Sequence, residues 1–117
     1  MTISRRTLLA ATGAAALLSI LPARAQSPAM PPARKIRTNG IRLAVHEVNE
    51  RGSGPAVVLL HGFPGLAYTW RHQIPALAGA GYRVIVPDLP GYGQSDPPPP
   101  VEAYDIAHLT ADLAGLL

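Results

Sequence analysis

The stretch from Ala56 to Gly65 carries the residues best placed to do chemistry. Five apolar residues, Ala56 to Leu60, are followed at once by His61-Gly62-Phe63-Pro64-Gly65. A short apolar run bounded by turn residues predicts a strand buried on both faces, as in a parallel sheet. The glycines and the proline of the turn allow backbone N–H groups to be aimed at a ligand instead of being paired. Fixed donors of this kind can stabilise a negatively charged oxygen that forms during a reaction.

Histidine offers a second kind of chemistry, because its ring can act as a base or bind a metal. His61 lies in the turn itself, whereas His46, His72 and His108 are dispersed along the chain. The dispersed histidines do not have the spacing of zinc ligands and the chain has no cysteine, so no metal site is expected. We interpret His46, His72 and His108 as surface residues.

A loop after a second apolar run raises two further possibilities. Gly91-Tyr92-Gly93 has the beginning of a dinucleotide-binding loop, but the position that needs a third glycine is Asp96, and four prolines follow it. A helix that could cradle a phosphate is therefore excluded there. Ser95 could be a nucleophile, yet no strand-turn-helix elbow surrounds it. No cofactor is expected.

The first 25 residues predict an export signal instead of folded structure. Arg5-Arg6 precede an apolar run, and Ala23-Arg24-Ala25 has the small-x-small pattern of a cleavage site. The stretch Ser4 to Leu9 is similar to a twin-arginine signal, whose route exports folded proteins. We therefore expect a protein exported to the periplasm or secreted, which meets an export translocase and a membrane only through this signal. An uncleaved anchor is the alternative, disfavoured because the apolar run is short for a bilayer.

The charge balance changes once this signal is set aside. The chain has 10 Lys and Arg residues against 7 Asp and Glu residues. Three of the basic residues, Arg5, Arg6 and Arg24, belong to the signal, so the mature chain is formally neutral. A nucleic-acid partner, which would require a basic face, is therefore not expected.

The segments before the central stretch predict a linker and a hairpin. Residues 26–34 contain three prolines and predict an extended linker. Residues 35–38 and 41–47 flank Asn39-Gly40, the pair that best adopts the two positive φ angles of a two-residue turn. Alternation of apolar and polar residues in 41–47 predicts a hairpin with one buried face and one exposed face.

A strand, a helix and a second strand are predicted around the turn. The helix should follow Gly65, be kinked or restarted at Pro75, and stop at Gly81 in a left-handed conformation. Residues 82–86 should form the second strand, which Pro87 ends. That order implies parallel strands joined by a right-handed crossover. The apolar face of this helix consists of Trp70, Ile74, Leu77 and Ala78.

The last segment predicts another helix. Asp105 can cap its N-terminus with a side-chain oxygen. Its apolar stripe consists of Ile106, Leu109, Leu113 and Leu116. Because the stripe continues to the last residues, we expect the sequence to end within an element whose partner is missing.

Three blocks of the sequence resemble the N-terminal part of an α/β-hydrolase, with spacing similar to the epoxide hydrolase branch. The blocks are His61–Gly65, Trp70–Leu77 and Tyr82–Asp96, and they occur in family order within residues 35–117. The resemblance implies a β-hairpin, then a βαβ unit with parallel strands and a C-terminal helix.

The resemblance also assigns roles to residues. It implies that Phe63 supplies a backbone N–H to an oxyanion hole and lines the substrate pocket with its ring. It makes His61 a structural residue, with Asp88 and Ser95 bonding to backbone. The structural motif residues are His61, Gly62, Pro64, Gly65, Asp88, Gly91, Gly93 and Ser95.

One motif of the family does not occur in these 117 residues. Neither Gly-x-Ser-x-Gly nor Gly-x-Asp-x-Gly is present, and the family places this nucleophile elbow on the strand after the helix that begins near Asp105. The catalytic acid, the histidine that activates water and the lid tyrosines are also unmatched. We therefore expect residues 35–117 to be an incomplete α/β-hydrolase core, truncated before the elbow strand and inactive alone.

The activity that the resemblance implies is the opening of an epoxide to a diol. An Asp nucleophile would form a covalent ester, which water would hydrolyse, and no cofactor would take part. A Ser esterase or lipase, a peroxidase-like enzyme or a haloalkane dehalogenase remains an alternative, so the small-molecule substrate is of the epoxide or ester class. A small exported binding module is the alternative outside catalysis.

Overall fold

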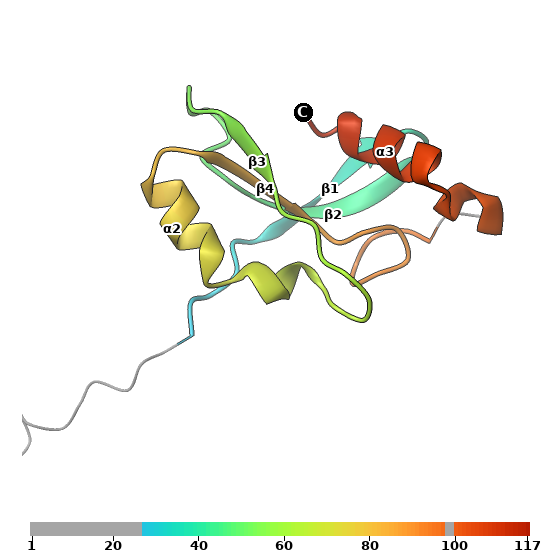
Figure 1. Ribbon diagram of the computed structural model, residues 1–117, viewed down its shortest axis with the longest axis horizontal. Coiled ribbons are helices and arrows are strands. Elements are labelled where there is room, and N and C mark those ends of the chain that lie inside the picture. The colour runs from blue at the N-terminus through green and yellow to red at the C-terminus, as the bar shows by residue number, and fades with distance from the viewer. Residues whose placement is uncertain (1–26, 98–99) are drawn as a thin grey trace, which may run out of the picture.

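A mixed four-stranded sheet with the order β1-β2-β4-β3 forms the centre of the molecule (Figure 1). The computed structural model describes residues 27–97 and 100–117. The expected export signal, residues 1–25, lies outside the described residues. The strands are β1 (Ala33–Thr38), β2 (Ile41–Val48), β3 (Ala56–Val58) and β4 (Arg83–Pro87).

The predicted hairpin is present as β1 and β2. These strands pair antiparallel, with Thr38 opposite Ile41, and Asn39 and Gly40 both have positive φ angles, 46° and 84°. The strand β1 already begins at Ala33, so the linker expected as far as residue 34 ends earlier.

The prediction that one hairpin face is exposed is wrong in the middle of β2, where Leu43, Ala44 and Val45 are all buried. The segment after β4 runs along this strand and is hydrogen-bonded to its backbone. The Asp88 N–H donates to the Ala44 carbonyl oxygen at 2.9 Å.

The strands β3 and β4 are parallel, as predicted, with Val57 opposite Val84. The Leu59 N–H continues this pairing by donating to the Ile85 carbonyl oxygen at 2.9 Å. The prediction that the Ala56 strand is buried on both faces is wrong for this structure: Ala56 is exposed, and Val57 and Val58 are half-buried. The reason is that β3 lies at an edge of the sheet, with β4 as its one neighbour among the described residues.

Two short helices connect β3 to β4. They are η1 (Ala67–Trp70) and α2 (Gln73–Gly79). The helical path restarts at Gln73, so Pro75 lies in the first turn of α2, where a helix does not need its N–H. Gly81 ends the segment with a φ of 92°, as the sequence predicts. Ala67 and Ile74 pack against Val84 and Val86 of β4.

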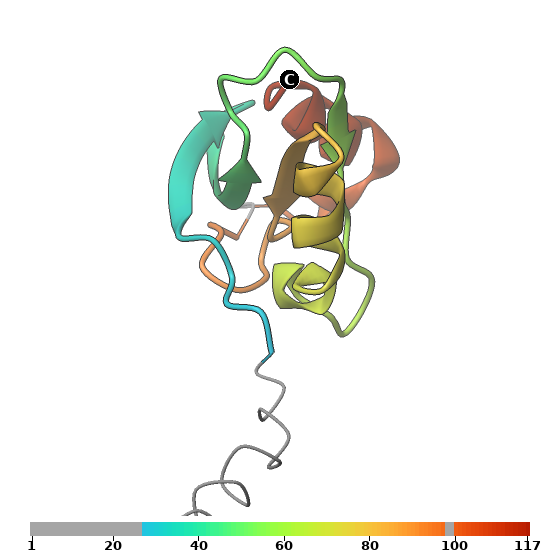
Figure 2. The ribbon, with the colours of Figure 1, turned by 90° about the vertical axis from the view of Figure 1, so that its left-hand side faces the viewer.

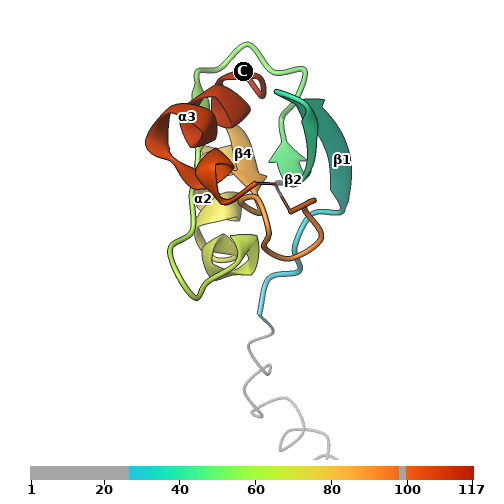
Figure 3. The same ribbon diagram turned by 90° about the vertical axis from the view of Figure 1, so that its right-hand side faces the viewer.

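The opposite face of the sheet is covered by α3 (Ile106–Ala114), which η2 (Val101–Tyr104) precedes. Leu116 packs there with Leu43, Val45 and Ile85, and successive residues of a strand point to opposite faces. Figure 2 shows α2 in front, and Figure 3, viewed from the other side, shows α3 in front. Within the described residues, no helix has the length and apolar character needed to cross a membrane.

The cap of α3 forms as predicted, but its apolar stripe is shorter. An Asp105 carboxylate oxygen accepts a hydrogen bond from the His108 N–H at 2.8 Å, which lowers the pKa of Asp105. Ile106 is 80% exposed, so its predicted place in the stripe is wrong. Neither hydrophobic cluster of the described residues includes Ile106.

An ion-pair cluster joins the strands to the end of α3. Arg83 Nε donates to Glu47 Oε1 at 2.7 Å, and Arg34 donates to the other carboxylate oxygen at 2.8 Å. The same Arg83 guanidinium reaches the carbonyl oxygens of Leu116 and Leu117, at 3.5 and 3.3 Å. Burial raises the pKa of Glu47, but the hydrogen bonds from Arg34 and Arg83 outweigh it and hold the pKa below its ordinary value.

Candidate functional site

Two loops meet where the parallel strands β3 and β4 end. Residues 59–66 follow β3 and residues 88–96 follow β4, and the carboxyl ends of parallel strands share one edge of the sheet. The Leu89 N–H donates to His61 Nε2 at 3.0 Å and joins the two loops, and the N–H of Ala67, the first residue of η1, donates to Asp88 Oδ1 at 2.9 Å. In open α/β sheets this edge is the usual place for a ligand.

The first loop turns sharply between Gly62 and Gly65. The Gly65 N–H donates to the Gly62 carbonyl oxygen at 2.6 Å, and the Phe63-Pro64 peptide bond is cis, the arrangement of a type VI turn. A Cβ atom on Gly65 would lie 2.9 Å from that carbonyl oxygen, whereas one on Gly62 would meet nothing within 4 Å. The turn therefore requires glycine at position 65.

Phe63 occupies the tip of this turn. Its N–H donates to no acceptor within residues 27–97 and 100–117, and its side chain is 88% exposed. An unpaired N–H at the end of a strand is the arrangement that an anion-binding donor requires. The ring lines neither of the two cavities described below.

His61 anchors the start of the turn. The side chain is 5% exposed, and because Nε2 accepts from Leu89, the ring hydrogen belongs on Nδ1. That atom lies 3.3 Å from the Gly62 carbonyl oxygen. The ring also packs edge-on against Tyr92, with centroids 4.9 Å apart and planes at 66°. Both nitrogens therefore face backbone groups, and neither faces the open side of the turn.

The second loop is held together by Asp88 and Ser95. Ser95 Oγ donates to the Asp88 carbonyl oxygen at 2.6 Å and accepts from the Ala44 N–H at 2.8 Å. Gly93 has a φ of 53°, and a Cβ there would collide with the Asp88 carboxylate. Gly91, with a φ of 81°, is similarly closed in by the Tyr104 hydroxyl. The buried Ser95 hydroxyl thus donates within the loop and accepts from β2, so both of its bonding directions are used for structure.

Asp96 has a role that the sequence did not reveal. Its carboxylate pairs with Arg42 Nε at 2.9 Å and with Lys35 Nζ at 3.2 Å. Hydrogen bonds from Arg42 and Lys35 hold the pKa of Asp96 below its ordinary value. These pairs tie the end of the second loop to the hairpin. The partners are 54 and 61 residues apart in the chain, so no local pattern could connect them.

The remaining histidines lie away from these loops. His46 is half-buried, and its Nδ1 lies 2.5 Å from the Pro31 carbonyl oxygen, so it is not a free surface residue. His72 is exposed, and His108 Nδ1 pairs with the Asp105 carboxylate at 2.7 Å. Among the described residues, no group of three or more His, Cys, Asp or Glu side chains could hold a metal ion.

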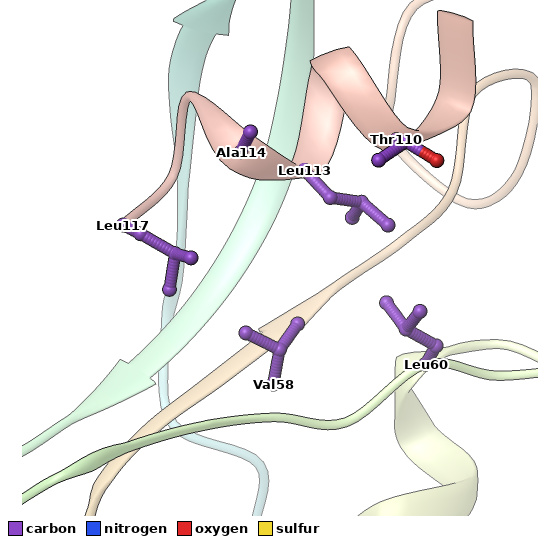
Figure 4. Close-up of a pocket in the computed structure, with 6 residues that line it drawn as sticks. All are labelled: Val58, Leu60, Thr110, Leu113, Ala114 and Leu117. Carbon is purple, nitrogen blue, oxygen red and sulfur yellow. The ribbon is translucent and has the colours of Figure 1, made fainter. Parts of the chain in front are cut away.

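An apolar groove of about 260 Å³ lies between the edge of β3 and α3 (Figure 4). Its lining residues are Val58, Leu60, Thr110, Leu113, Ala114 and Leu117. Thr110 supplies the one polar side chain of the lining, and none of the lining side chains is titratable. A second cavity of about 270 Å³ lies on the surface beside Asn39 and His108. Of the two loops, only Leu60 lines the apolar groove, and no loop residue lines the second cavity.

A protein-family model described as the alpha/beta hydrolase fold matches residues 55–117. Epoxide hydrolase A of Mycobacterium tuberculosis is 62% identical over 87 residues, which cover 74% of this chain and 27% of that protein. An epoxide hydrolase of Caballeronia sordidicola is 54% identical over 82 residues, 70% of this chain and 24% of that protein.

Solved structures give the same result. Epoxide Hydrolase A from Mycobacterium thermoresistibile matches with a TM-score of 0.69 and 57% identity, over 74% of this chain and 27% of that one. An epoxide hydrolase from Vigna radiata, VrEH1, matches with a TM-score of 0.64 and 48% identity, over 72% of this chain and 25% of that one. The chain thus spans about a quarter of the length of the relatives it matches.

Proposed function

The chain belongs to the α/β-hydrolase family, and on that basis we propose that it takes part in epoxide hydrolysis, with the Phe63 N–H as a donor to the oxyanion. The observation that carries the proposal is the unpaired Phe63 N–H at the carboxyl end of β3, among residues 27–97 and 100–117. The relatives named as epoxide hydrolases, at 62% and 57% identity, support the choice of substrate class.

The chemistry places a specific demand on that N–H. A nucleophilic carboxylate attacks an epoxide carbon, the ring C–O bond breaks, and the alkoxide takes a proton from an acid to give a covalent ester. Water, deprotonated by a histidine–acid pair, then attacks the ester carbonyl, whose oxygen becomes negative until the diol leaves. A fixed N–H that points at that oxygen lowers the barrier by about 3–4 kcal/mol, or roughly 10²- to 10³-fold in kcat.

Other groups of the reaction are not assigned to residues of this chain. No Gly-x-Asp-x-Gly or Gly-x-Ser-x-Gly occurs in its 117 residues, and His61 faces backbone groups through both ring nitrogens. We propose that these residues alone have no turnover and melt with weak cooperativity. Incubation with styrene oxide and chromatography for the diol tests this. A purified monomer that forms the diol would contradict it, and a sharply melting monomer would favour the exported binding module.

The role of Phe63 can be tested inside a complete enzyme. Residues 33–117 would replace the matching quarter of the Mycobacterium thermoresistibile enzyme, with which this chain shares 57% identity. We expect the hybrid to hydrolyse epoxides. Exchanging the Phe63 amide for an ester, by incorporating phenyllactic acid, removes the N–H and should lower kcat about 10²- to 10³-fold.

Phe63→Leu is the matched control for this exchange. It keeps the N–H and shortens the exposed ring, so we expect an altered KM with kcat largely retained. An ester exchange that leaves kcat unchanged would exclude Phe63 as an oxyanion donor. The identity of the nucleophile is a separate question: Gly-x-Asp-x-Gly read beyond codon 117 of the gene would support the epoxide mechanism, and Gly-x-Ser-x-Gly an esterase or peroxidase-like one.

A further inference from the structure

We propose that Asp88 is a positioning residue whose carboxylate sets the direction of the Phe63 N–H. The inference rests on the proposed function of Phe63 as an oxyanion donor. Asp88 does not act on the oxyanion itself. It acts through Ala67, whose N–H donates to Asp88 Oδ1 at 2.9 Å.

The turn that presents Phe63 is held at both of its ends by the same neighbouring loop. At its start, the His61 ring accepts from the Leu89 backbone, and at its end the Ala67 backbone donates to the Asp88 side chain. Between these two points, the Gly65 N–H closes the turn on the Gly62 carbonyl oxygen at 2.6 Å. The Phe63 N–H has no partner among the described residues, so its direction depends on these neighbouring contacts.

The Asp88 carboxylate is itself fixed in place. Asp88 is 6% exposed, and its carboxylate packs so closely on Gly93 that a Cβ atom there would collide with it. Its carbonyl oxygen accepts from Ser95 Oγ, which in turn accepts from the Ala44 N–H of β2. The acceptor for Ala67 is therefore attached to the centre of the sheet, and a charged acceptor forms the stronger kind of hydrogen bond.

Asp112 provides a matched control. It is an aspartate of similar burial, 4% exposed, and one carboxylate oxygen accepts from Asn39 Nδ2 at 2.9 Å. It lies in α3, on the face of the sheet opposite η1. Asp112→Ala therefore removes a comparable buried carboxylate without a contact to the Phe63 turn.

The experiment compares the full 117-residue chain with Asp88→Ala, Asp88→Asn and Asp112→Ala, all labelled with ¹⁵N. Residual dipolar couplings of the backbone report the direction of each N–H, and hydrogen exchange reports its protection. We expect Asp88→Ala to change the Phe63 coupling beyond error and to accelerate exchange at Ala67 about tenfold or more. Asp88→Asn keeps an oxygen acceptor and should restore both values, while Asp112→Ala should leave both unchanged.

Two results would overturn the proposal. One is faster exchange at Ala67 with an unchanged Phe63 coupling, and the other is an equal change of that coupling in Asp112→Ala. If Asp88→Ala does not fold, lactic acid at position 67 removes only the Ala67 N–H. The Phe63 coupling of that variant then tests the proposal: a change supports it and an unchanged value overturns it. None of these readings depends on turnover, so failure of the hydrolase proposal is detected separately, by the epoxide assays.

Discussion

The Nε2 atom of His61 accepts a hydrogen bond from the backbone N–H of Leu89 at 3.0 Å, across 28 residues of sequence. This bond joins the segment after β3 to the segment after β4, and it occupies the ring nitrogen that would otherwise be available as a base. The His61 ring, which the sequence alone offers as a candidate base, therefore has a structural partner in the Leu89 backbone. Removing the His61 side chain should affect the stability of the fold as well as the site.

His61→Ala should lower the free energy of unfolding by about 2–4 kcal/mol, because it empties a buried site and leaves the Leu89 N–H without its acceptor. His61→Phe keeps a ring but provides no acceptor, so it should lower the free energy of unfolding by about 1–3 kcal/mol. Urea denaturation of each variant, made in the hybrid with the Mycobacterium thermoresistibile enzyme, measures the change, because a free energy of unfolding is defined only for a cooperative transition. The exposed His72→Ala is the control, and an equal loss there would refute the assignment.

Gly93→Ala should be destabilising, by about 1–3 kcal/mol, because the new Cβ meets the Asp88 carboxylate at a position with φ of 53°. Gly79→Ala is the matched substitution in α2, where a Cβ has open space. It should be neutral or stabilising by up to about 1 kcal/mol, since alanine favours a helix more than glycine does. In thermal melts, the melting temperature should therefore fall for Gly93→Ala and stay unchanged or rise for Gly79→Ala. An equal fall in both variants would contradict the packing around Asp88.

Glu47 should make stability depend on pH. Its pKa in the folded chain is lowered by Arg34 and Arg83, against the effect of burial, so its contribution is complete above the unfolded pKa of about 4.3. The contribution should be lost as the pH falls from there through the folded pKa. Glu47→Gln should cost about 1–3 kcal/mol at pH 7, and the difference from the unmodified chain should shrink below about pH 4.

Glu50→Gln is the control for this series. Glu50 pairs with Arg34 on the surface, so its loss should cost less than about 1 kcal/mol. Denaturant unfolding measured from pH 7 to pH 3 gives both curves. A Glu47→Gln difference that stays constant over this range would disprove the linkage.

We propose that the chain is exported and begins at Gln26 after cleavage. This rests on Arg5-Arg6 and Ala23-Arg24-Ala25. Replacing both arginines by lysine should abolish twin-arginine export, as measured by immunoblots of cell fractions. Mass spectrometry of the exported product should give a first residue of Gln26. Export that persists in the double variant, or a product that still carries Met1, would contradict the proposal.

The elements whose chemistry is local could be predicted from the sequence. Asn39-Gly40 has the two positive φ angles of its turn, Asp105 caps α3, and Gly81 ends the helical segment. Each depends on a preference of the residue itself, or of its close neighbours, for one backbone conformation. The α/β-hydrolase fold followed from such elements in their order, together with three sequence blocks.

What the sequence could not show depends on contacts between distant segments. The Asp96 pairs with Arg42 and Lys35 join the loop after β4 to the β1–β2 hairpin across more than 50 residues. Ile106 fits a helical stripe by spacing, yet it is 80% exposed because the described chain places no partner against it. In the same way, the apolar run at Ala56 predicts burial on both faces, but its position at the edge of the sheet follows from strand order, which periodicity does not encode.

The single guanidinium of Arg83 also has a mechanical consequence. It contacts Glu47 on β2 and the carbonyl oxygens of Leu116 and Leu117, while its own backbone belongs to β4. Through this one side chain, the segment after α3 is thus attached to two central strands of the sheet.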